Sequence, residues 1–181
     1  MGAWSADAFD NDSALDWLGD LLPSTRGIDW TAEYRTVLDE FAAFEQRRQS
    51  GTNREVRTAE EAEYLIGLFD PPDPEYAAII RKTIGEEYED NGDDETFTLV
   101  AAAAVLLATV SGDLSGVPDE FRVPDLQGAT AALHLRGELA GALRQVLLNK
   151  PLLKDCGAKW KKSVVAMADQ LDALESVGNG R

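Results

Sequence analysis

Two acidic pairs are the residues of this chain whose type and spacing best fit metal chemistry. Glu60 and Glu63 stand three positions apart, and Glu87 and Asp90 repeat that spacing after 23 intervening residues. Carboxylate oxygens are the hard ligands that Mg²⁺ prefers. Two such pairs on neighbouring helices are typical of all-α nucleotide pyrophosphohydrolases, in which the metal activates the phosphate chemistry. Chains rich in Glu also produce such pairs by chance, and then the pairs belong to a solvated helix face. Both interpretations stay open at this point.

The sequence offers no assembled nucleophile. It holds one His and one Cys, which excludes an intrachain disulfide framework and a zinc ribbon. His134 stands between two leucines, and no Ser-His-Asp or Cys-His spacing forms around it. Cys156 falls on an apolar helical stripe, so we expect a buried structural thiol. The residues therefore favour a protein that is not an enzyme.

The charge is the most unusual property of the composition. The 33 acidic and 17 basic residues give a net charge of −16, and all of it belongs to the first hundred positions, with 24 acidic and 8 basic side chains. A negative field of this size repels nucleic acid phosphates and anionic membrane surfaces, so we expect neither as a partner. Most charge runs are simply solvated faces. If this one meets a partner, the charge favours a protein with a basic surface.

Length and hydropathy indicate one soluble domain. The 181 residues are 44% apolar, within the range of a single globular domain. The first twelve residues have no basic or apolar region, so no signal peptide is expected. The longest uncharged run, between Glu95 and Asp113, is short for a membrane span and reads as a buried core helix. We therefore expect a cytoplasmic location.

Helical periodicity dominates the chain, and no window alternates as a strand does. In residues 29–48, for example, Trp30, Tyr34, Val37, Leu38 and Phe41 form one apolar stripe. The start and stop signals predict helices at about 13–22, 29–48, 59–70, 74–88, 96–110, 126–148 and 150–174. The predicted fold is an all-α irregular bundle of six or seven helices. It forms a single domain over 1–181, with a short extended arm at 1–12 and a frayed tail at 177–181.

The first eighteen residues carry a distinctive pattern. Its members are Gly2, Trp4, Phe9, Asn11, Asp12, Ala14 and Asp16. The pattern resembles the opening of a bacterial domain-of-unknown-function family, DUF four-two-five-nine, which reads roughly Met-Gly-x-Trp-Gly-x-x-x-Phe-x-Asn-Asp-x-Ala-x-Asp. Ser5 departs from the second Gly of that pattern. The likeness extends more loosely to the Ala-rich stretch, Val117-Pro118 and the Trp160 helix. The resemblance implies a bacterial source and no known activity.

Two interpretations of this N-terminal segment remain. In the first, Trp4 and Phe9 anchor an arm that closes the bundle, and the Asp-Asn-Asp cluster caps the first helix. In the second, polar and aromatic side chains form a small binding site, made of Trp4, Asp10, Asn11, Asp12, Asp16 and Trp17.

From the sequence, we expect a non-catalytic acidic protein-binding module, such as an antitoxin or a nuclease-neutralising protein, in which carboxylates mimic phosphate. Such a protein needs no cofactor. The alternative is the Mg²⁺-dependent nucleotide pyrophosphohydrolase built on the two acidic pairs. A purely structural oligomer is a third class, and the sequence leaves the oligomeric state open.

Overall fold

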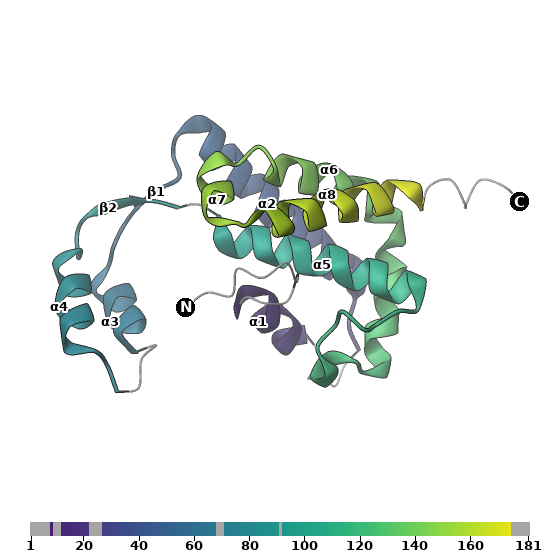
Figure 1. Cartoon of the computed structure of the whole chain (residues 1–181), viewed down its shortest axis with the longest axis horizontal. Helices are drawn as coiled ribbons and strands as arrows, with labels where there is room; N and C mark the ends of the chain where they lie inside the picture. The colour runs from purple at the N-terminus through teal and green to yellow at the C-terminus, as the bar shows by residue number, and fades with distance from the viewer. Residues whose placement is uncertain (1–7, 9–11, 22–26, 68–70, 91, 175–181) are drawn as a thin grey trace, which may run out of the picture. The chain divides into compact units, whose positions relative to one another are not determined.

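The computed structural model describes residues 8, 12–21, 27–67, 71–90 and 92–174 (Figure 1). In this part of the chain there are eight α-helices, two 3₁₀ segments and one antiparallel pair of short strands. The prediction of an all-α irregular bundle is confirmed, with eight helices in place of six or seven. Apart from Ala8 and Asp12, the predicted arm and the predicted tail lie outside the described residues.

The chain divides into two compact units, which we describe separately. The larger unit comprises Met1–Glu45 and Gly92–Arg181, and the smaller one comprises Gln46–Asn91. The prediction of a single domain stays a prediction.

The larger unit is built around one central helix. Its elements are α1 (Asp12–Leu21), most of α2 (Trp30–Ser50), α5 (Asp93–Ser111), η1 (Asp119–Phe121), η2 (Pro124–Leu135), α6 (Arg136–Val146), α7 (Lys150–Asp155) and α8 (Ala158–Ala173). Helix α5 packs against α1, η2, α6 and α8, and α6 runs along α8 (Figure 1). Most of α5 is buried, including the small side chains of Ala101, Ala102 and Ala103, which let neighbouring helices approach closely. The prediction that the Ala-rich segment forms a core helix is confirmed.

Helix α2 buries the apolar stripe that the sequence predicted. Trp30, Tyr34, Val37, Leu38 and Phe41 are all buried. The stripe recurs every three to four residues, which places these side chains on one side of a helix. That side faces the core of the larger unit.

The segment predicted as one helix over 126–148 begins as a 3₁₀ helix instead. Over η2 the backbone forms tight turns, and regular α-helix starts only at Arg136. The indole N–H of Trp30 donates a hydrogen bond to the carbonyl oxygen of Asp125 over 3.1 Å. A Cβ atom on Gly128 would lie 2.7 Å from the same indole ring. Glycine is therefore required here because Trp30 lies directly on the backbone.

The smaller unit pairs two strands and two short helices. Its elements are β1 (Arg54–Val56), α3 (Ala59–Gly67), α4 (Pro74–Lys82) and β2 (Glu87–Glu89). Both predicted helix starts are confirmed. The Thr58 hydroxyl accepts from the Glu61 N–H, and the Glu61 carboxylate accepts from the Thr58 N–H, which is a capping box. Asp73 caps α4 by accepting from the N–H groups of Glu75 and Tyr76.

Two predictions about this unit were wrong. Helix α4 ends at Lys82 and does not reach residue 88, and strands form where none was predicted. Gly85, at φ +84°, takes a left-handed conformation that turns the chain back. Strand β2 then pairs with β1, with Glu55 opposite Tyr88. Three-residue strands are too short to show alternation in a sequence.

Among the described helices, α5 is one that is long and apolar enough to cross a membrane, by length and composition only. Of its most apolar stretch, 56% is buried inside the fold, and the core helix of a folded protein meets the same criterion.

Candidate functional site

The N-terminal candidate residues are only partly described. Trp4, Asp10 and Asn11 lie outside the described residues. Asp12 and Asp16 are exposed on α1. Trp17 is half-buried, and its ring meets the ring of Tyr34 edge to face, with centroids 6.2 Å apart. The described residues therefore place Trp17 against the core, while the choice between an anchoring arm and a binding site stays open.

The first carboxylate pair of the magnesium hypothesis lies on α3, in the smaller unit. Glu60 is exposed. Glu63 accepts two hydrogen bonds from the Arg81 guanidinium of α4, over 2.7 and 2.9 Å. This bidentate contact holds the pKa of the Glu63 carboxyl below its usual value. The contact ties the two helices together.

The second pair lies on and after β2, and not on a helix as predicted. Glu87 faces Arg54 across the strand pair, at 3.7 Å. The Asp90 carboxylate lies 3.6 Å from Arg47, and the Asp90 carbonyl accepts from the buried amide of Asn53 over 2.9 Å. Three of the four carboxylates thus have guanidinium partners. Among the described residues, no group of three or more His, Cys, Asp or Glu side chains is arranged to hold a metal ion.

A tyrosine cluster that the sequence did not predict joins the strands to α3. The Tyr88 hydroxyl lies 3.0 Å from Glu55 and 3.1 Å from Glu61, two carboxylates between which it shares its proton. Burial and these two hydrogen bonds raise the pKa of Tyr88 far above its usual value. Arg57 lies over the ring at 5.0 Å. These contacts join β1, β2 and α3 within the smaller unit.

The smaller unit also exposes large apolar side chains. Tyr64 is 68% exposed and Ile79 is 55% exposed, and Val56 and Ile84 are exposed as well. Together they are four of the six exposed large apolar side chains in the described part of the chain; the other two are Leu148 and Val165. Isolated exposed apolar residues are ordinary, and these four belong to β1, α3, α4 and the segment between α4 and β2.

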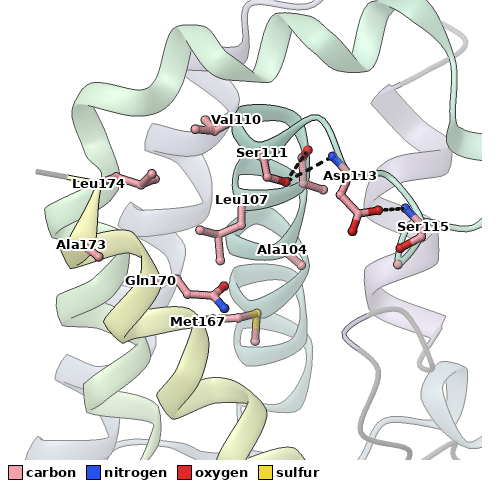
Figure 2. A pocket seen from close by; sticks show the side chains of 12 residues that line it. Ala104, Leu107, Val110, Ser111, Asp113, Ser115, Met167, Gln170, Ala173 and Leu174 are labelled. Atoms are coloured by element: carbon pink, nitrogen blue, oxygen red, sulfur yellow. Dashed lines mark hydrogen bonds between the residues drawn. The ribbon is translucent and has the colours of Figure 1, made fainter. Parts of the chain in front are cut away.

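The larger unit contains a groove of about 640 Å³ beside the last turns of α5 (Figure 2). Leu107 and Val110 of α5 face Met167, Gln170 and Leu174, which belong to α8 and its C-terminal cap. The end of α5 and the loop after it close the other side with three polar residues, which are Ser111, Asp113 and Ser115. The sequence did not predict this groove, since it depends on how far two distant helices stand apart.

Two isolated candidates from the sequence have ordinary surroundings. Cys156 is buried and makes no disulfide, as predicted. His134 is exposed, and its Nδ1 lies 3.0 Å from the Ala131 carbonyl oxygen of the preceding turn.

Comparisons of the chain with protein-family models, with curated proteins and with solved structures find no match. The resemblance of the N-terminal segment to DUF four-two-five-nine stays a prediction.

Proposed function

We propose that this chain is a non-catalytic acidic protein-binding module, and that the smaller unit, Gln46–Asn91, carries the surface for a partner with a basic face. The observation that carries this proposal is the balance of apolar burial in the unit. Its described buried apolar side chains are Ala62, Ile66 and Ala77, whereas Val56, Tyr64, Ile79 and Ile84 are exposed.

The exposed side chains lie on the sides of the helices turned away from their buried residues. Tyr64 stands two residues from both Ala62 and Ile66, so it lies on the opposite side of α3. Ile79 has the same relation to Ala77 in α4. A helix pair with so small a core gains little from folding alone. A partner that covers the outer side of either helix would remove exposed apolar area from water.

The charge of the unit supports a basic partner. Between residues 46 and 91 there are 11 acidic and 6 basic side chains. Part of the basic set is already engaged within the unit, as Arg81 is by Glu63 and Arg54 by Glu87. The excess carboxylates would steer a positively charged partner and fix its orientation. Nuclease-neutralising and antitoxin-like binders are the concrete form of this proposal, since a phosphate-binding surface is basic.

Site-specific photo-crosslinking in cells tests the proposal. A photoreactive amino acid replaces Tyr64 or Ile79 in one pair of variants, and Leu148 or Val165 of the larger unit in a matched control pair. We expect the first pair to crosslink one protein with an excess of Lys and Arg, and the control pair not to do so. The proposal is contradicted if all four positions give the same products, or if the smaller unit gives none.

The alternative function is the Mg²⁺-dependent nucleotide pyrophosphohydrolase. It rests on Glu60, Glu63, Glu87 and Asp90, and metal-dependent stabilisation of the protein separates it from the binding module.

A further inference from the structure

We infer that the groove between the C-terminal ends of α5 and α8 is a binding site for a small amphiphilic cation, with an apolar body and an ammonium group. This site lies in the larger unit and is independent of the proposed protein-binding surface. Its volume of about 640 Å³ falls within the range of small-molecule sites.

The walls of the groove suit an apolar body. Leu107 and Val110 extend from α5 toward Gln170 and Leu174 on the facing segment, with Met167 beside them (Figure 2). These apolar side chains are only half-buried, so the groove is open to a ligand. Methionine and leucine walls accept chains of varied shape.

One end of the groove is negative. Asp113 and Ser115 line it on the side away from Leu174 (Figure 2). The Ser115 hydroxyl and backbone N–H, together with the charge of Arg122, hold the pKa of the Asp113 carboxyl below its usual value. The C-terminal end of α5, whose carbonyls carry partial negative charge, adjoins this carboxylate. Among the described residues that line the groove, Asp113 is the one that is ionisable.

A neighbouring arginine, Arg122, stabilises the charge of Asp113 without forming an ion pair with it. Arg122 donates to the carbonyl oxygens of Val117 and Ser115, over 2.6 and 2.9 Å, and forms an ion pair with Asp119. No ion pair joins Asp113 to a basic side chain in the part of the chain that the structure describes. An ammonium group at this end would meet the Asp113 carboxylate directly, while its alkyl chain lies along Leu107 toward Leu174.

The protein supplies its own reporter for this site. The chain has two methionines, Met1 and Met167, and Met167 lines the groove. Labelling the methionine methyl groups with ¹³C therefore gives few signals, and the Met167 signal is assigned by its loss in Met167→Leu. The full chain is titrated with n-octylammonium, with n-octanol as the neutral probe of equal length and ethylammonium as the short cation.

We expect n-octylammonium to shift the Met167 signal saturably, n-octanol to bind about threefold more weakly, and ethylammonium to leave the signal unchanged. Asp113→Asn keeps the oxygen that accepts from Ser115 but removes the charge. It should therefore lower the affinity for n-octylammonium to the affinity for n-octanol. Asp39→Asn, an exposed carboxylate on α2, is the matched control and should change nothing. Ala108→Phe fills the groove and should weaken both octyl probes by about tenfold.

Three results would overturn the inference. The first is a Met167 signal that no probe shifts. The second is equal affinity for octylammonium in the wild type and in Asp113→Asn, which would leave no role for the carboxylate. The third is a loss of n-octylammonium affinity in Asp39→Asn equal to that in Asp113→Asn, which would assign the effect to the overall negative charge of the protein.

Discussion

The hydroxyl of Tyr34 on α2 donates a hydrogen bond to the backbone carbonyl of Ala102 on α5 over 2.8 Å, and both residues are fully buried. The rings of Trp17 and Trp30 pack on the Tyr34 ring, each with its centroid 6.2 Å away. One side chain thus joins three helices of the larger unit through packing and a polar contact.

Removing the hydroxyl alone should destabilise the protein mildly. In Tyr34→Phe the ring packing is kept, and the lost hydrogen bond should lower the free energy of unfolding by about 1 kcal/mol. Urea denaturation measures this change. A loss below about 0.3 kcal/mol would show that the hydroxyl makes no such hydrogen bond. A loss above about 3 kcal/mol would show that it belongs to a larger network.

The same hydroxyl should make stability fall at alkaline pH. Burial raises the pKa of Tyr34 well above its usual value of 10.0. As the pH rises past about 10, the unfolded chain releases this proton while the native state keeps it, so ionisation favours unfolding. The contribution is fully present below pH 10 and is lost above it. Urea melts between about pH 9 and 11.5 should show a shallower loss of stability in Tyr34→Phe than in the wild type. Tyr88 is present in both proteins, so its contribution cancels in this comparison. Identical slopes would contradict the burial of a neutral phenol.

Two glycines on neighbouring segments should respond to alanine in opposite directions. A Cβ at Gly128 would lie 2.7 Å from two atoms of the Trp30 indole, so Gly128→Ala should cost about 1–3 kcal/mol as Trp30 shifts. At Gly141, within α6, nothing lies within 4 Å of the added Cβ. Gly141→Ala should therefore be neutral or stabilise by up to about 1 kcal/mol. Thermal melts and Trp fluorescence compare them, and equal costs would refute the close approach of Trp30.

Magnesium should not stabilise the protein through the acidic pairs. Arg81 already binds both oxygens of Glu63, and Glu87 and Asp90 face Arg54 and Arg47. We expect millimolar Mg²⁺ to change the melting temperature of the wild type and of Glu63→Gln equally. A rise confined to the wild type, by mass action at a metal site, would favour the hydrolase.

Most helices and several of their starts were predictable because their signals are local, whereas the end of α4, the 3₁₀ segment η2 and the break between α7 and α8 in the helix predicted over 150–174 were not. The stripe from Trp30 to Phe41, the capping box at Thr58 and the Asp73-Pro74 start each depend on residues within a few positions of one another. The strand pair was not predictable in this way, because Glu55 and Tyr88 are distant in sequence and each strand has three residues.

The candidate sites were less predictable than the helices. The spacing of Glu60, Glu63, Glu87 and Asp90 identified carboxylates but not their guanidinium partners, which approach from other elements. Exposure of Tyr64 and Ile79, and the groove beside Leu107, depend on which helix sides find a neighbour. Periodicity identifies an apolar side chain but does not say whether the fold covers it.

The central claim is that the smaller unit binds a basic protein through apolar and acidic side chains together. The direct test is the Kd of the crosslinked partner for the wild type and for Tyr64→Ser/Ile79→Ser, measured at about 50 and 300 mM salt. Leu148→Ser/Val165→Ser, which changes two exposed apolar residues of the larger unit, is the control. The account predicts that the first double variant and the higher salt each weaken binding by about tenfold or more, and that the control stays within about twofold. A partner whose affinity is indifferent both to salt and to the loss of Tyr64 and Ile79 would contradict it.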